Sequence, residues 1–345
     1  MGLFTIAWNS LTSSGTTTDT RNVFAAIRKS DLADGTLEAC WDYLAWALNG
    51  LLEGKVPERD VRGRRHARAG RAVGWRAATV QVRGDWEFYA SCLGLARWDG
   101  VPHMCFACGA EQGDGADPDL VWTGSARGWT RTIKTHESWL EELAALGRVA
   151  PVLFSVRGLR LEGVMIDVLH ALDQGCTSHL IGNVWFEIMA KWGGSLENQV
   201  AALQADIKKW HKDNKVRYSL EGKLTLARVR TSGDWPKFKG KGANTRHLIG
   251  YTLALAKANN SGSAHDRRRV AVCELMDRFY VILANGGRWF SDEEKAEIQN
   301  IGKNFLAIYR NLSFEALHDP DSPRKWKMTQ KFHLFEHLCS KQAPL

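Results

Sequence analysis

The sequence predicts an α/β region over residues 1–160 and an all-helical region over residues 161–330. Two observations carry this prediction. The first region alternates short β-type runs with an amphipathic segment, and the second consists of consecutive segments with apolar residues at helical spacing. The 345 residues are 44% apolar and 24% charged, which is ordinary for a soluble globular protein. No segment reaches the roughly 18 uninterrupted apolar residues of a transmembrane helix, so we expect no membrane span.

The elements of the first region follow in order. FTIAWNSL (4–11) and RNVFAAIRK (21–29) are predicted strands joined by a polar hairpin loop. TLEACWDYLAWALNGLLEG (36–54) has the apolar spacing of a helix and ends at a glycine. WRAATVQVRGD (75–85) alternates like a strand, and a short helix and a CxxC turn follow it. PVLFSV (151–156) is predicted to be a short buried strand.

The second region is predicted to be helical throughout, with polar loops between its segments. The predicted helices lie within residues 165–192, 196–213, 246–258, 268–286 and 292–312.

The order of the predicted elements indicates a fold class. A ribonuclease-H-like nucleotidyl-transfer fold runs through three antiparallel strands, a helix, a fourth strand, a helix and a fifth strand. The chain matches this order from the second strand onward. We therefore expect an incomplete α/β ribonuclease-H-like core (1–160), a large all-α insertion (161–330), and a final segment (331–345) that returns to the core.

Asp85 lies where a predicted strand ends and a helix begins. The carboxyl ends of strands in α/β sheets gather functional carboxylates, and two-metal phosphoryl chemistry needs several of them. A turn is the alternative interpretation of this Gly-Asp pair. Asp167 and His170 lie three residues apart and also allow two interpretations. They could be an accessory acid and imidazole, or a helix cap with a satisfied histidine.

Two cysteines and two histidines have the spacing of metal ligands within each pair. Cys105 and Cys108 form a CxxC turn, and His333 and His337 would project from one face of a helix. Together they are the ligand types of a structural Cys₂His₂ zinc site, although 224 residues separate the pairs. Reduced buried cysteines and surface histidines are the alternative, and His103 and Cys339 are nearby rival ligands.

Positive charge is concentrated in three clusters within a net charge of +8. A polyanion, most often nucleic acid, is the partner that such clusters indicate, while solvated basic loops are the alternative. The candidate DNA contacts are Arg62, Arg64, Arg65 and Arg68 in the first cluster, Lys237, Lys239, Lys241 and Arg246 in the second, and Arg267 and Arg268 in the third. Most of the fifteen tryptophans lie among apolar residues and are predicted to be core side chains.

Seven scattered cysteines argue against a disulfide framework and for a reducing compartment. The start, MGLFTIAWNSL, has neither a basic region nor a small-residue cleavage site, so we expect no secretion. A thiol oxidoreductase using CFAC is a further alternative. The glycine-rich acidic loop that follows the motif disfavours it, because redox CxxC motifs usually open a helix.

These motifs together resemble the DDE transposases of the CACTA (En/Spm) class, in particular the divergent copies of dinoflagellate-like genomes, over most of the chain. In that class an Asp ends the fourth strand about twenty residues before a CxxC, as Asp85 does here. A DxxH follows the next strand, matched by Asp167 and His170. An HxxxH lies late in the helical insertion, matched by His333 and His337.

The resemblance implies a nuclear protein, otherwise cytoplasmic, that binds DNA, forms oligomers and descends from enzymes of DNA cleavage and strand transfer. It implies structural Zn²⁺ on the Cys and His pairs, and Mg²⁺ or Mn²⁺ at Asp85 if the chain is catalytic. The family's first Asp and its Glu have no counterpart, since Asp34-Gly35 falls at an expected helix cap and the chain stops at KQAPL. We therefore expect a chain truncated at both ends and inactive alone. A domesticated, non-catalytic DNA- or protein-interaction module is the alternative.

Overall fold

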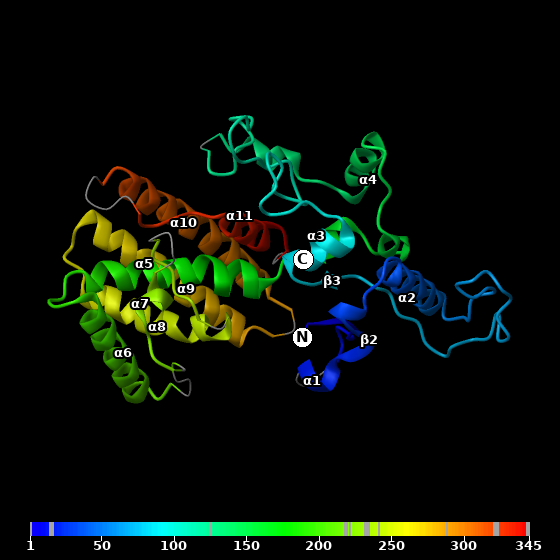
Figure 1. Cartoon of the computed structure of the whole chain (residues 1–345), viewed down its shortest axis with the longest axis horizontal. Coiled ribbons are helices and arrows are strands. Elements are labelled where there is room, and N and C mark those ends of the chain that lie inside the picture. Colours follow the sequence, from blue (N-terminus) through cyan, green and yellow to red (C-terminus); the bar gives the residue numbers. More distant parts are fainter. Residues whose placement is uncertain are drawn as a thin grey trace. The chain divides into compact units, whose positions relative to one another are not determined.

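The computed structural model describes residues 2–13, 17–124, 126–216, 220, 222–230, 235–240, 242–287, 289–319 and 324–342. The chain divides into two compact units (Figure 1). The first unit is Met1–Val82 with Trp86–Val164, and the second is Arg83–Asp85 with Met165–Leu345. The segment 331–345 thus belongs to the same unit as the helices that precede it. Each unit is described in turn.

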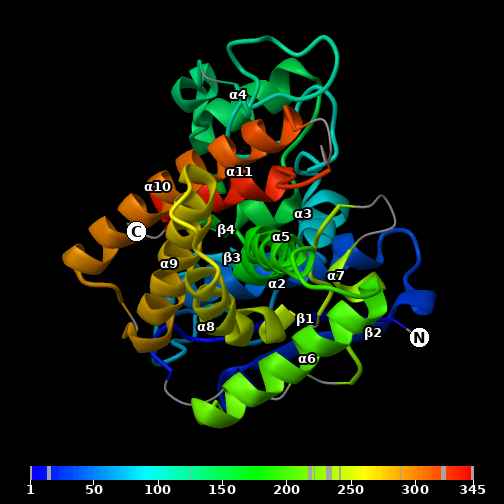
Figure 2. The same ribbon diagram turned by 90° about the vertical axis from the view of Figure 1, so that its left-hand side faces the viewer.

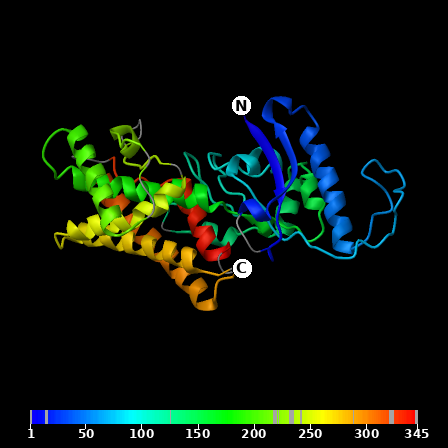
Figure 3. The same ribbon diagram turned by 90° about the horizontal axis from the view of Figure 1, so that it is seen from below.

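A hairpin opens the first unit, as predicted. Strands β1 (Leu3–Trp8) and β2 (Asn22–Arg28) pair antiparallel, and the short helix α1 (Thr17–Thr20) lies between them in the chain. The hairpin lies beside helix α2 (Thr36–Glu53; Figure 3). The rings of Phe4 in β1 and Trp41 in α2 meet edge to face, with their centroids 6.5 Å apart.

Helix α2 confirms the periodicity argument. Trp41 and Ala45, four residues apart, are both buried, as the helical spacing requires. Gly54 ends the helix with φ +70°, and its N–H bonds back to the carbonyl of Leu51. Only glycine adopts this left-handed conformation without a steric penalty, which is why the helix stops there.

The strand predicted over residues 75–85 is mostly wrong. Only β3 (Val82–Arg83) is a strand, and it pairs with β4 (Val164–Met165) in a second two-stranded sheet. An alternating pattern gives a strand only where a partner supplies hydrogen bonds, and this partner is two residues long. The predicted short helix is present as α3 (Trp86–Leu93), directly after Asp85.

The strand predicted over residues 151–156 is also wrong, because Val152–Ser155 forms a 3₁₀ turn, η3. The side chain of Asn49 in α2 fixes this turn: its amide donates to the carbonyl of Ser155 at 3.1 Å and its carbonyl accepts from the N–H of Arg157 at 2.8 Å. The remaining helices of the first unit are η1 (Lys29–Asp31), η2 (Gly128–Thr132), α4 (His136–Ala145) and η4 (Leu161–Gly163).

The second unit confirms the predicted helices. They are the π-helix η5 (Leu169–Cys176), α5 (Thr177–Met189), α6 (Leu196–Asp213), α7 (Leu226–Val229), α8 (Gly242–Ala258), α9 (Ala264–Asn285), α10 (Asp292–Leu317), α11 (Gln330–His337) and the π-helix η6 (Leu338–Gln342). Serine caps open three of the longest: Ser195, Ser263 and Ser291 each accept a hydrogen bond from a backbone N–H in the first turn.

Helix α5 is the centre of the second unit (Figure 2). Nearly all of its residues are buried, because η5, α6, α8 and α9 pack around it and side chains of α10 and α11 contact it. Trp185 donates to the hydroxyl of Thr252 in α8 at 3.0 Å, and Asn183 donates to Tyr309 of α10 at 3.3 Å. A helix that is buried on nearly every side needs hydrogen-bond partners for its polar side chains inside the core, and these two bonds supply them.

None of the described helices is long and apolar enough to cross a membrane. About 54% of the chain is helical, and the described strands form two sheets of two strands each. This arrangement neither establishes nor rules out a ribonuclease-H-like core, so that fold class stays a prediction.

Candidate metal centre

The first unit holds Cys105 and Cys108 in a buried turn between α3 and η2. Backbone groups shape this turn around the sulfur atoms: the N–H of Ala107 donates to Cys105 Sγ at 3.3 Å, and the backbone of Ala110 donates to Cys108. Amide N–H groups that point at a sulfur favour its thiolate form, which is the form that binds a metal. The turn is therefore shaped for two thiolate ligands.

The second unit presents His333 and His337 one helical turn apart on α11. The apolar neighbours Phe332 and Phe335 on the same helix are fully buried, which anchors α11 and fixes the direction of both imidazoles. Their Nε2 atoms lie 3.1 Å apart, so both rings present the same nitrogen to one point. This is the arrangement that i and i+4 histidines adopt on a shared ion.

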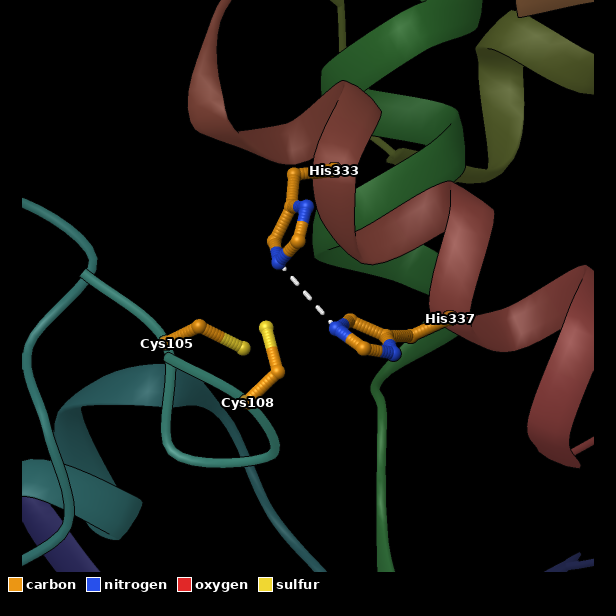
Figure 4. A group of neighbouring side chains, drawn as sticks. All are labelled: Cys105, Cys108, His333 and His337. Carbon is orange, nitrogen blue, oxygen red and sulfur yellow. Dashed lines mark hydrogen bonds between the residues drawn. The ribbon is translucent and has the colours of Figure 1, made fainter. Parts of the chain in front are cut away.

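The four side chains form one buried cluster (Figure 4). One ligand atom from each of Cys105, Cys108, His333 and His337 lies within 4.8 Å of all the others. A tetrahedral zinc ion with bonds of about 2.0–2.3 Å would hold its ligand atoms about 3.3–3.8 Å apart. The 4.8 Å limit lies about 1 Å above this range, so the cluster could hold a metal ion after side-chain rotations that bring the ligand atoms together.

The electrostatics of the thiol pair also fit a cation. The hydrogen bond with Cys105, followed by burial, raises the pKa of Cys108 above its ordinary value. Two buried sulfurs this close cannot both ionise without a compensating positive charge. A divalent cation supplies that charge, and four protein ligands fill a tetrahedral set without an open position for substrate, which is typical of a structural site.

The two rival ligands lie elsewhere. His103 is exposed and pairs with Glu111 at 3.3 Å. Cys339 is buried within the second unit, with Sγ 2.7 Å from where a Cβ on Gly302 would stand. Burial raises the pKa of the Cys339 thiol, so this cysteine has the character of a packed core residue.

Asp85 is exposed and lies between β3 and α3, as predicted. Among the described residues, the Cys and His cluster is the one group of three or more His, Cys, Asp or Glu side chains gathered as metal ligands, and Asp85 does not belong to it. The described residues therefore do not fit the several-carboxylate site that two metal ions need.

Asp167 and His170 are in contact at the start of η5. His170 Nδ1 pairs with one carboxylate oxygen of Asp167, and the other oxygen accepts from the N–H of Leu169 at 2.8 Å. The pair therefore gives His170 a partner within its own turn, while Val168, at the N-cap of η5, makes no side-chain cap hydrogen bond. An accessory role for the pair in catalysis stays a prediction.

Three of the ten predicted DNA contacts are held in ion pairs with acidic side chains. These pairs are Arg64 with Asp60, Arg246 with Asp173, and Arg268 with Glu315. Asp173 is fully buried, so its pair with Arg246 contributes to the core of the second unit. Side chains in such pairs are less free to contact phosphate.

The other predicted contacts differ in exposure. Arg62, Arg65, Arg68, Lys239 and Arg267 are exposed, and Lys237 is half-buried. Lys241 lies outside the described residues.

Two lysines near Lys237 are not among the predicted DNA contacts. Lys327 and Lys331 both act on Lys237 through their positive charge, and the ammonium of Lys327 lies 5.3 Å from the ring centroid of Trp235. The signal was present in the run RKWKMTQK (324–331), which has four basic residues.

A scan against protein-family models, a search of the curated proteins and a search of the solved structures find no match.

Proposed function

We propose that Cys105, Cys108, His333 and His337 bind a structural zinc ion. The observation that carries the proposal is the convergence of four buried donor atoms of the right types within 4.8 Å. Thiolate and imidazole together are ligands that zinc prefers. When bound, zinc would supply cross-linking between the CxxC turn and α11 and would neutralise the two thiolates.

We further propose that the chain is a transposase-like, DNA-binding protein of nuclear location, related to the CACTA class of DDE enzymes. The motif order through Asp85, the CxxC turn and the HxxxH helix supports this relationship. Exposed arginines and lysines in both units support binding to the DNA backbone, where such side chains give affinity without sequence choice.

We propose no catalytic step for this chain. DNA cleavage and strand transfer in the family depend on Mg²⁺ or Mn²⁺ held by several carboxylates. The described residues place Asp85 outside any group of three or more metal-ligating side chains. We therefore expect the chain by itself to be inactive as a nuclease and to act through binding.

Metal content tests the zinc proposal directly. The purified chain should contain one equivalent of zinc by mass spectrometry, and Cys105→Ser or His337→Ala should lose most of it. Cys40→Ser and His318→Ala are matched controls, because both residues lie away from the cluster and should leave the content unchanged. Full zinc retention in Cys105→Ser and His337→Ala would remove the ligand assignment.

Gel-shift titration with duplex DNA at two salt concentrations tests the second proposal. Binding should weaken steeply with salt, because cationic side chains release counterions from the phosphates. A folded, zinc-loaded chain that retains no DNA at low salt would instead favour the non-catalytic protein-interaction module.

A further inference from the structure

A row of four aromatic rings runs along one side of the first unit. It begins at Phe24 in β2, continues through Tyr43 and Trp46 on α2, and ends at His66 in the loop that follows α2. Successive ring centroids lie 6.1, 5.5 and 5.8 Å apart. These four residues are called the ring row below.

The loop that carries His66 is ordered by its own backbone. Its two arms are joined by hydrogen bonds from Val56 to Arg71 at 2.9 Å and from His66 to Glu58 at 2.9 Å. The indole N–H of Trp46 also donates to the carbonyl of Arg59 at 2.7 Å, which ties the loop to α2. The arginines of this loop are therefore held beside the ring row.

Most of these arginines have no acidic partner. Arg62, Arg65, Arg68 and Arg71 are exposed, and none makes an ion pair within the described residues. Asp60 pairs with Arg64 and also accepts from the backbone N–H of Arg62 at 2.9 Å, so its charge is used in shaping the turn. A surface with several free guanidinium groups fits a ligand with repeated negative charges.

Each residue of the ring row is partly or largely exposed. Tyr43 has 49% of its surface exposed although it contacts rings on both sides. Phe24, Trp46 and His66 are each only half-buried. Aromatic rings that keep an open face beside cationic side chains are the recurrent platform for unpaired bases, because every base has a π-face and duplex bases are already stacked.

We propose that the ring row and its arginine loop form a binding surface for single-stranded DNA. Tyr43 and Trp46 would stack with unpaired bases, and the loop arginines would contact the phosphates between them. The inference relies on the proposed function only in the choice of DNA as the nucleic acid. It needs neither the zinc site nor Asp85, since every residue involved belongs to the first unit.

The full zinc-loaded chain should be titrated by fluorescence anisotropy against three labelled probes: oligo(dT) of 20 nucleotides, an abasic strand of the same length, and a 20-base-pair duplex. Oligo(dT) should bind more tightly than the abasic strand. Tyr43→Leu, which keeps an apolar side chain against Phe24 and Trp46 but removes the π-face, should weaken oligo(dT) binding by roughly 5- to 100-fold. It should leave the affinities for the abasic strand and the duplex unchanged.

Two further variants sharpen the test. Tyr43→Phe keeps the ring and should bind oligo(dT) like the unmodified chain. Trp289→Ala removes a 63% exposed ring from the second unit and should also change nothing. The double change Arg65→Gln with Arg68→Gln should weaken all three probes and lower the salt slope, because it removes phosphate contacts only.

The outcomes separate this inference from the proposed function. Equal affinity for oligo(dT) and the abasic strand, or a folded Tyr43→Leu chain with unchanged oligo(dT) affinity, would overturn the stacking surface. Failure to bind duplex while oligo(dT) binding remains sensitive to Tyr43 would instead contradict the proposed duplex binding and leave the inference standing. Thermal unfolding of each variant confirms that the first unit is still folded.

Discussion

Replacing Lys237 with methionine should stabilise the protein while weakening its binding to DNA. Burial, and then the charge of Lys331 and of two other lysines, lowers the pKa of Lys237 to about 8 from the ordinary 10.5. The backbone at this position is fixed, because the N–H of Lys237 donates to the carbonyl of Val229 at 3.0 Å and the N–H of Phe238 donates to the carbonyl of Ser178 at 2.8 Å. The folded protein therefore holds this ammonium in an unfavourable position.

The magnitude follows from the difference between the two pKa values. A depression of this size corresponds to about 3 kcal/mol, and partial exposure of Lys237 reduces the expected effect to about 2 kcal/mol. Below pH 8 both the folded and the unfolded chain bind the proton, so the full penalty applies. Between pH 8 and 10.5 the unfolded state binds more protons, so stability rises with pH and the penalty disappears.

Urea unfolding of the unmodified chain and of Lys237→Met at several pH values measures this effect. The variant should be more stable by about 2 kcal/mol at pH 7, and its advantage should shrink as the pH approaches 10.5. Lys303→Met is the matched control, since Lys303 is exposed and is not among the charges that act on Lys237, and it should leave stability unchanged. An advantage that is absent at pH 7, or that persists undiminished at pH 10.5, would refute the reasoning.

The same substitution, Lys237→Met, is also expected to weaken DNA binding. A phosphate near Lys237 would offset the repulsion from the other lysines, so DNA should favour the charged form that the free protein disfavours. Lys237→Met should then bind duplex more weakly and with a salt slope reduced by about one. Unchanged affinity would mean that this lysine cluster does not contact DNA.

Three other perturbations have expected outcomes. Chelation of zinc should lower the melting temperature by roughly 5–10 °C relative to protein in zinc at about 100 times its Kd, and re-addition should restore it, as calorimetry would show. Gly182→Ala should destabilise the protein by about 2 kcal/mol or more in urea unfolding, because the added Cβ would stand 2.4 Å from the Cα of Lys237. A variant as stable as the unmodified chain would contradict this. Glu187→Gln should lower the free energy of unfolding by about 3 kcal/mol, since the buried carboxylate accepts from Trp326 at 2.7 Å and from Arg269 at 3.3 Å. A decrease below about 1 kcal/mol in urea unfolding would contradict this.

The helices could be predicted from the sequence, because each helix is specified by residues that lie within a few positions of one another. The spacing of Trp41 and Ala45 predicts the buried face of α2, and Gly54 predicts its end. The serine caps of α9 and α10 act within a single turn of their own helix. Elements whose stabilising contacts lie within a few residues can be predicted from a sequence without knowledge of the rest of the fold.

The strand predictions for two short apolar runs were wrong because the structure of these runs depends on distant contacts. PVLFSV has the composition of a strand, but a side chain more than a hundred residues earlier, Asn49, supplies the hydrogen bonds that bend it into a turn. WRAATVQV alternates correctly, but only Val82 and Arg83 meet a partner strand. Short runs acquire their structure from distant contacts, which composition does not encode.

The candidate metal centre has some features that depend on neighbouring residues in the sequence and others that depend on distant contacts. The three-residue spacing of the cysteines and the four-residue spacing of the histidines are local and could be read from the sequence. The convergence of the pairs depends on the path of the 224 residues between Cys108 and His333. The ligand types and the resemblance suggested it, and the structure brings the four donor atoms together. The burial of all four side chains could not be read from the sequence either.

The basic clusters show why counting charge overstates a binding surface. Arg64 and Arg246 were predicted DNA contacts, yet each is engaged by a carboxylate of its own unit, one in a turn and one in a core. Exposed arginines without an ion pair among the described residues, such as Arg65 and Arg68, can exchange water for phosphate without breaking an interaction. The difference predicts that Arg65→Gln reduces DNA affinity more than Arg64→Gln does. The relevant quantity is therefore the positive charge that the fold leaves unpaired, and in the first unit this charge is concentrated beside the ring row.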